Sequence, residues 1–372
     1  MKLFAQYLLF ILILFSYQAS IAENNSDSTK LFGGRIDPYI NQHFEGEWFF
    51  GYRYSDLKET EINQFSLKRS YITFKHSFDE RFDFRFTQDI TLDTEGDDAG
   101  NIETRLKYCY LNVNLEDFSF VAEPYVEVGL VHTPWIEFEQ KINPYRVQGT
   151  MFLDRTGILN SADFGFTFGG LFGGVINEEY RKNVSSQYPG KYGSFAIGVY
   201  NGTGYHSIEK NRNKTIEGRF TFRPFPTSVP GLQISYNPAF GKGNTEMNPD
   251  FVTHSSYLSY ESRQLAFSAQ YFQGRGNSRG SYADSLGNAF DNRGYSFFGE
   301  FRVPKTKLAL FARYDKFLSD GYNNLDSQRF IGGISYYFFR SSKFVIDVDY
   351  FDPVASSLKD QVIYEAILEV NF

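Results

Sequence analysis

The charged residues of this 372-residue chain alternate with apolar residues in many short stretches. In RFDFRFTQDITL, residues 81–92, the charged side chains Arg81, Asp83, Arg85 and Asp89 share one parity, and the phenylalanines have the other. Because successive side chains of a β-strand point to opposite faces, one face of this stretch is charged and the other is apolar. A face that mixes both signs of charge can attract and orient ions without any nucleophile or metal.

The histidines and the cysteine, which could serve in catalysis or metal binding, form no motif for either. The five histidines are scattered, HExxH is absent, and Cys109 is the only cysteine. Asp347 and Asp349 share a strand face, but charged ladders are ordinary on the wall of a water-filled barrel. The glycine-rich stretch GRGNSRG at 274–280 is expected to be a flexible loop. We therefore expect no enzyme activity, no metal and no cofactor.

The alternating stretches continue to the end of the chain and predict an all-β fold of about sixteen strands, with fourteen or eighteen as alternatives. The predicted strands are 40–54, 62–76, 81–92, 102–115, 123–132, 163–175, 192–201, 213–223, 231–240, 253–261, 263–273, 293–303, 306–317, 328–339, 343–351 and 361–372. A soluble β-sandwich would also alternate, but its strands are usually about 5–6 residues long, shorter than several of these. We expect a transmembrane antiparallel β-barrel with lipid outside and water inside.

The composition agrees with a barrel of this kind. Aromatic residues make up 19 % of the chain, with 41 Phe and 27 Tyr, yet the mean hydropathy is −0.38. Apolar residues are thus dispersed among polar ones, as expected for strands with one face in lipid and one in water. The net charge of −7, from 37 basic and 44 acidic residues, argues against nucleic-acid binding.

The first residues have the pattern of a secretory signal peptide. Lys2 is followed by an apolar run at 8–15 and by the small-residue site Ser20-Ile21-Ala22. We expect residues 1–22 to be a cleaved signal peptide, 23–38 a leader and 39–372 the barrel. An uncleaved membrane anchor is the alternative.

One long segment, 133–160, interrupts the alternating pattern between two good strands. Its composition is rich in apolar and aromatic residues, which is unlike a disordered loop. We expect it to fold into the lumen and narrow it, with an outer loop that packs on itself or on a neighbouring subunit as the alternative. The candidate constriction charges are Glu137, Glu139, Lys141, Arg146, Asp154 and Arg155.

Three stretches carry a resemblance to a known family: VEVGLVHTPWIEFEQ at 126–140, MFLDRTGILNSADFGFTFGG at 151–170 and FAIGVYNGTG at 195–204. The chain resembles the phosphate-selective porin O and P family of bacterial outer-membrane porins. The last strand, which ends in Phe372, looks like the C-terminal signal that the barrel assembly machinery reads. The resemblance implies a sixteen-stranded homotrimeric channel for diffusion of small solutes or anions.

The acidic composition and the mixed signs on the lumen parity depart from a strict phosphate selector, which needs convergent arginines and lysines. We therefore predict an outer-membrane porin for small hydrophilic solutes or anions, without strict phosphate specificity. The predicted pore-lining residues are Arg81, Asp83, Arg85, Asp89, Glu217, Arg219, Arg223, Asp347 and Asp349. The alternative is a non-conducting outer-membrane barrel that acts as a receptor or as a subunit of an export or adhesion complex; a barrel hydrolase ranks third.

Overall fold

The computed structural model describes residues 41–57, 60–93, 99–321, 326–354 and 360–372. The predicted signal peptide and leader therefore lie outside the described residues. The strands are β1 (Asn41–Leu57), β2 (Thr60–Ser77), β3 (Phe82–Leu92), β4 (Ile102–Asn114), β5 (Val121–His132), β6 (Ala162–Phe172), β7 (Gly193–Tyr200), β8 (Thr215–Phe222), β9 (Leu232–Lys242), β10 (Asp250–Glu261), β11 (Leu265–Arg275), β12 (Asp291–Arg302), β13 (Leu308–Ser319), β14 (Ser327–Phe339), β15 (Ser342–Asp352) and β16 (Gln361–Asn371). The helices are α2 (Pro134–Ile142), η1 (Arg146–Gln148), α3 (Phe152–Arg155) and α4 (Glu178–Asn183).

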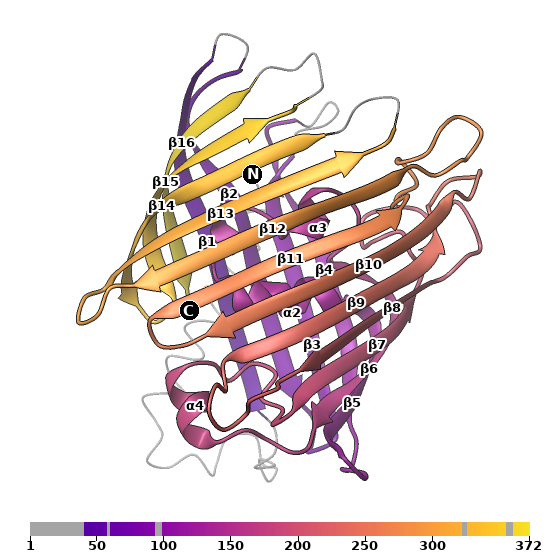
Figure 1. Cartoon of the computed structure of the whole chain (residues 1–372), viewed down its shortest axis with the longest axis vertical. Coiled ribbons are helices and arrows are strands. Elements are labelled where there is room, and N and C mark those ends of the chain that lie inside the picture. Colours follow the sequence, from indigo (N-terminus) through magenta and orange to yellow (C-terminus); the bar gives the residue numbers. More distant parts are fainter. Residues whose placement is uncertain (1–40, 58–59, 94–98, 322–325, 355–359) are drawn as a thin grey trace, which may run out of the picture. The chain divides into compact units, whose positions relative to one another are not determined.

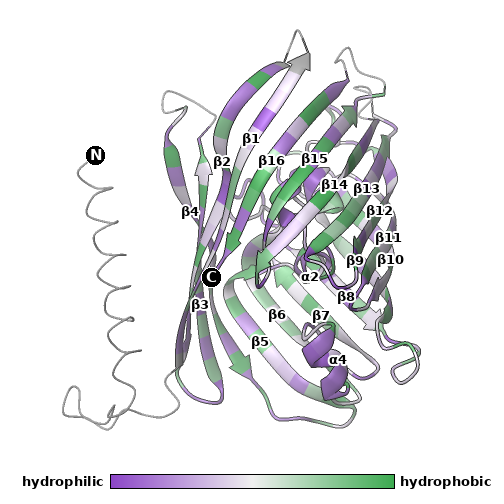
Figure 2. Cartoon of the chain, turned by 90° about the vertical axis from the view of Figure 1, so that its left-hand side faces the viewer, coloured by the Kyte–Doolittle hydropathy of each residue, from purple (hydrophilic) through white to green (hydrophobic). Residues whose placement is uncertain are grey.

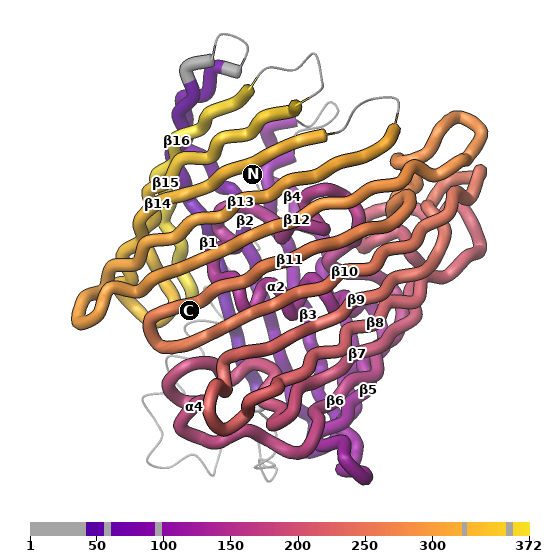
Figure 3. The backbone as a smooth tube through the Cα atoms, in the orientation of Figure 1, coloured from indigo at the N-terminus to yellow at the C-terminus, as the bar shows by residue number. Residues whose placement is uncertain are grey.

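The strands of residues 42–372 form one closed antiparallel barrel (Figure 1). Each strand pairs with its neighbours in the chain (Figure 3), and β1 pairs with β16 to close the ring, with Trp48 opposite Val370. Beyond that pair, the amides of Gly46 and Phe372 donate to each other's carbonyl oxygens at 3.0 and 3.1 Å. The prediction of sixteen strands is confirmed for the described residues, and each strand overlaps its predicted range.

Burial alternates along the strands with the period of two that the sequence predicts. Hydrophilic and hydrophobic residues also alternate along the strands (Figure 2). On β8 the side chains of Glu217 and Arg219 are 2 % and 1 % exposed, whereas Ile216 and Phe220 are 50 % and 41 % exposed. The buried parity faces the inside of the closed barrel, and the exposed apolar parity covers its outside. Within the described residues, no helix combines the length and apolar character needed to cross a membrane.

The two ends of the barrel differ in their connections. At the terminal end, where β1 begins and β16 ends, turns such as 78–81 and 262–264 are short. At the opposite end, which we call the loop end, connections such as 201–214 and 276–290 are long. The connection 173–192, which contains α4, is the exception, because it is long and lies at the terminal end.

Candidate functional site

Residues 133–161 connect β5 to β6 and contain α2, the longest described helix. Pro134 occupies its first turn, where the missing N–H of proline removes no helical hydrogen bond. The free amide of Trp135 donates to Oε1 of Glu217, on β8, at 3.3 Å. A carboxylate at this position is favoured by the exposed amides and by the helix dipole. A side chain of the barrel wall therefore fixes the start of α2.

The apolar side of this segment packs against buried side chains of the barrel wall. The ring of Trp135 meets Tyr257 of β10 edge-on, with centroids 5.0 Å apart. Phe152 of α3 contacts Phe272 of β11 in the same way at 5.5 Å. Tyr257 and Phe272 are 2 % and 0 % exposed, which puts them on the enclosed face of their strands. The segment therefore covers the inner face of β10 and β11.

Polar contacts connect the same segment to β12, the neighbour of β11, and to β2, farther round the barrel. The hydroxyl of Tyr145 donates to Oε1 of Glu300, on β12, at 2.9 Å. Nη2 of Arg146 donates to the hydroxyl of Tyr71, on β2, at 2.5 Å. Because β2 and β12 are far apart in the strand order, these contacts place residues 145 and 146 between separate parts of the wall.

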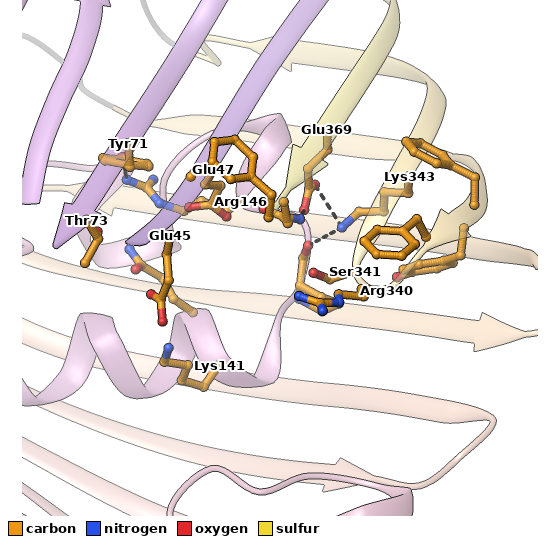
Figure 4. A pocket seen from close by; sticks show the side chains of 18 of the residues that line it. Glu45, Glu47, Tyr71, Thr73, Lys141, Arg146, Arg340, Ser341, Lys343 and Glu369 are labelled. Carbon is orange, nitrogen blue, oxygen red and sulfur yellow. Dashed lines mark hydrogen bonds and ion pairs between the residues drawn. The ribbon is translucent and has the colours of Figure 1, made fainter. Parts of the chain in front are cut away.

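A cavity of about 920 Å³ remains between this segment and the strands β1–β4 and β12–β16 (Figure 4). Its basic lining residues are Arg85, Lys107, Lys141, Arg146, Arg302, Lys307, Arg340 and Lys343, and its acidic ones are Glu45, Glu47, Glu137 and Glu369. Among the described residues, only Arg302 and Lys343 of these eight cations have a carboxylate within 4.0 Å. The cavity wall therefore carries an excess of unpaired positive charge.

Lys107 lines the cavity and is 2 % exposed. Its ammonium lies 5.0, 5.6 and 5.3 Å from the ring centroids of Tyr71, Tyr108 and Tyr205. Its hydrogen bond is to Oγ of Ser161, at 3.4 Å. Aromatic faces compensate a buried cation only in part, so this ammonium favours a nearby anion.

Four of the predicted pore-lining and constriction residues line this cavity together, namely Arg85, Glu137, Lys141 and Arg146. Most of the others have a hydrogen-bond or ion-pair partner in the barrel wall or in the segment 133–161. The contacts are Asp83 with Ser77 at 2.5 Å, Asp89 with Arg69 at 3.1 Å, Arg155 with Asp315 at 3.2 Å, Asp347 with Gln148 at 3.1 Å and Asp349 with Arg329 at 2.5 Å. Glu139 is buried, and Asp154, in the first turn of α3, has no ion pair within 4.0 Å among the described residues.

The placement of Arg81 in a strand is wrong. Arg81 lies in the turn before β3, and its side chain is 69 % exposed, 3.4 Å from Glu116 of the next turn at the terminal end. The amide of Arg81 donates to Oδ1 of Asp79, and this local turn delays the start of β3 to Phe82.

Sequence reasoning missed Lys107, which is one of the two most buried cations of the cavity, with Lys343. The register between β3 and β4 shifts at this point, since Thr87 faces Tyr108 while Gln88 faces Leu106. A bulge of this kind inserts one residue and breaks the alternation, so Lys107 and Tyr108 both face inward. The available signal was the sequence RLKYCY, in which the polar parity changes.

Burial and neighbouring charges act in opposite directions on the glutamates of α2. Burial raises the pKa of Glu139 to about 7, because Arg313 offsets the loss of hydration only in part. Burial also disfavours ionised Glu137, but His132, Lys141 and a hydrogen bond from Tyr188 outweigh it and lower the pKa to about 2. Glu137 is therefore charged at neutral pH, whereas Glu139 is partly protonated.

The glycine-rich stretch contains one arrangement that the sequence reasoning passed over, GxSxG at 276–280. Ser278 lies in the loop between β11 and β12, and its Oγ accepts a hydrogen bond from Asn160 at 2.9 Å. A nucleophile elbow needs a strand-to-helix turn, and here a loop and then β12 follow. Among the described residues, no three metal-ligating side chains gather.

No family model and no curated protein matches the chain. Solved structures do match it. The anion-selective porin from Comamonas acidovorans has a TM-score of 0.60 at 10 % identity, covering 90 % of this chain and 100 % of that one. OmpF of Salmonella typhi, in complex with daunomycin, has 0.59 at 10 % identity, covering 90 % and 98 %. The outer-membrane channel DcaP of Acinetobacter baumannii has 0.58 at 10 % identity, covering 92 % and 100 %.

The fold is that of an outer-membrane porin. Identities of this size establish the fold alone, so the resemblance to the phosphate-selective family stays a prediction. Within this porin fold the long connection 173–192 covers the inner side of β8. The guanidinium of Arg219 lies 4.6 and 4.5 Å from the rings of Phe138 and Tyr188, and Arg223 donates to the carbonyl of Gly190 at 3.2 Å. Neither arginine is among the residues that border the cavity.

Proposed function

We propose that the chain is a passive diffusion channel in the outer membrane of a Gram-negative bacterium, narrowed by residues 133–161, that prefers small anions. The cavity carries this proposal. It lies within a closed barrel of porin fold, and six of its basic side chains have no carboxylate within 4.0 Å among the described residues. A cation without a counter-charge in a confined space lowers the energy of a passing anion and raises that of a passing cation.

Conduction in this proposal needs no conformational cycle. The apolar core of the segment 133–161 fills the side of the barrel near β10 and β11, so solute passes along β1–β4 and β12–β16. Arg85, Lys107 and Arg146 replace part of the hydration of the anion as it passes, while the segment sets the size limit. The chain then acts by diffusion rather than as an enzyme.

Strict phosphate selection is not part of the proposal. Glu47 and Glu137 stand among the cations of the cavity and oppose tight binding of a multivalent anion. The proposal also includes export through a cleaved signal peptide, insertion by the assembly machinery through Phe372, and a homotrimer. A trimer form is described for one structural neighbour, OmpT of Vibrio cholerae, at 11 % identity.

Planar-bilayer recording of the purified protein tests the proposal. We expect steady single-channel currents and, in a potassium chloride gradient, a reversal potential that shows preference for chloride. Phosphate at low concentration should leave the chloride current unblocked. Preference for potassium would refute the anion selectivity, and block by low phosphate would instead favour a phosphate-selective channel.

A non-conducting receptor or complex subunit is the second candidate, favoured by contacts that reach over the interior from the loop end. The hydroxyl of Tyr205, in the loop 201–214, donates to Asp89 of β3 at 2.9 Å. In the loop 276–290, Asn277 donates to the carbonyl of Gly157 at 3.0 Å. If the folded protein carries no current at any voltage, these loops close the barrel and the second candidate is correct.

A further inference from the structure

Tyrosines on the outer face of the barrel mark a polar boundary near the loop end. Their hydroxyls hydrogen-bond to polar side chains at the next outward-facing position toward that end. The pairs are Tyr236 with His254 at 2.7 Å, Tyr271 with Gln273 at 3.4 Å and Tyr314 with Gln328 at 2.7 Å. Aromatic girdles of this kind lie at the level of lipid headgroups in membrane barrels. This reading rests on the proposed membrane location.

Two cations lie just beyond this boundary on neighbouring strands. Arg293 is on the outer face of β12 and Lys316 on that of β13, and the register makes them diagonal neighbours, because Lys316 faces Tyr295. Among the described residues, neither has a carboxylate within 4.0 Å, whereas the neighbouring Arg275 pairs with Asp291 at 2.7 Å. Diagonal neighbours on a sheet are close enough to contact one anionic group together.

Arg293 lines a groove in the outer surface with a polar and an apolar part, and Lys316 lies beside this groove, opposite its lining residue Tyr295. The polar part, about 480 Å³, is lined by residues that include His254, Gln273, Arg293 and Asp320. Two of the three carboxylates in this lining are paired, Asp250 with Lys242 and Asp291 with Arg275. Asp320 has no ion pair within 4.0 Å among the described residues, so it opposes Arg293, and the adjacent Lys316 leaves one positive charge in excess.

The apolar part of the groove, about 530 Å³, is lined by residues that include Ile234, Leu258, Ala269, Tyr295 and Phe297. On β10, β11 and β12 its residues continue the polar part at the next outward-facing positions, toward the terminal end. Small side chains such as Ala269, between larger aromatic neighbours, leave this space open. A charged recess that continues into an apolar one matches the shape and chemistry of a lipid.

We propose that this groove binds one lipid whose headgroup carries a phosphate, with the phosphate on Arg293 and Lys316 and an acyl chain in the apolar part. Arginine and lysine form charge-assisted hydrogen bonds with phosphate oxygens. The acyl chain contacts apolar side chains in the apolar part of the groove, and this contact removes no polar group from water.

Native mass spectrometry of the purified full chain tests this binding site. The probes are lipid A with two phosphates and the same glycolipid after treatment with phosphatase. We expect the wild-type protein to retain one phosphorylated lipid and the double variant R293Q/K316Q to bind it roughly 30-fold more weakly, from about 1 kcal/mol for each cation. The matched control R263Q/K305Q, which removes two exposed cations from turns at the terminal end, should bind like the wild type.

A second variant, A269F, fills the apolar part and should weaken binding of the phosphorylated and dephosphorylated lipids alike. Equal retention of both lipids by the wild type, or unchanged binding by R293Q/K316Q, would overturn the proposal. If A269F instead changes the number of subunits in the complex and not its lipid content, a second copy of the chain occupies the groove and the lipid proposal is wrong. Single-channel recording of the same variants tests conduction on its own, so a failure of the lipid proposal can be distinguished from a failure of the channel proposal.

Discussion

Replacing Arg146 by glutamine should weaken anion selectivity by an amount that the structure allows us to estimate. Arg146 borders the cavity, is 9 % exposed and lies against the ring of Tyr71 at 5.7 Å. An ion that passes about 7 Å from the guanidinium through water gains or loses about 0.6 kcal/mol, which is a factor of about 2.7 in local concentration. Because chloride and potassium respond in opposite directions, their permeability ratio should change about 7-fold.

The assay is the reversal potential across a planar bilayer in a potassium chloride gradient. The matched control is R155Q, which removes an arginine from the same segment but at a site that contacts Asp315 and does not border the cavity. R146Q should move the reversal potential toward that of potassium, and R155Q should leave it near the wild-type value. If both variants shift it equally, or R146Q leaves it unchanged, solute does not pass along this cavity.

Three further outcomes follow from the segment 133–161. Burial raises the pKa of Glu139 to about 7 from an ordinary 4.5, so the folded state loses stability as the pH rises from 4.5 to 7. The variant E139Q cannot ionise at this position. In urea unfolding it should therefore have a free energy of unfolding higher by roughly 3 kcal/mol at pH 8, and almost unchanged at pH 4. E217A removes the acceptor of the Trp135 amide and should lower the free energy of unfolding by about 1 kcal/mol. E217Q keeps an acceptor oxygen and should lower the free energy of unfolding less. F152A leaves a void beside Phe272, so the free energy of unfolding should fall by about 3–5 kcal/mol, and single-channel conductance should rise.

The strands could be predicted from sequence because a sheet with lipid on one face and polar surroundings on the other imposes a local period of two. Ile216 and Glu217 are adjacent in the chain and 50 % and 2 % exposed, and the alternation around them was enough to separate the two faces. Strand ends do not follow from the alternation, as the turn at Arg81 shows, because the Asp79 carboxylate accepts a hydrogen bond from the Arg81 amide and so sets where the strand begins.

The interior contacts could not be predicted in the same way. Tyr257 and Phe272 have the parity that should face water, and they are buried because the segment 133–161 packs on them. A pattern read along one strand contains no information about a segment more than 90 residues earlier in the chain. The same limit applies to Arg219, whose neighbour Tyr188 lies in a connection that alternation does not describe.

The unpaired charge of the cavity wall is positive, although the net charge of the whole chain is negative. The difference arises from which charges are paired rather than from how many charges there are. The chain carries a net charge of −7, yet many of its inward-facing carboxylates are neutralised by neighbours, as Asp315 is by Arg313 at 2.9 Å and Glu365 by Lys68 at 2.7 Å. A paired charge adds little to the field a few ångströms away, because its partner cancels most of it. Arg85 and Arg146 have no such partner among the described residues, so the field that a solute meets beside them is positive. Counting charges in the sequence could give the composition of the wall but not this field, since the pairing depends on which strands lie side by side.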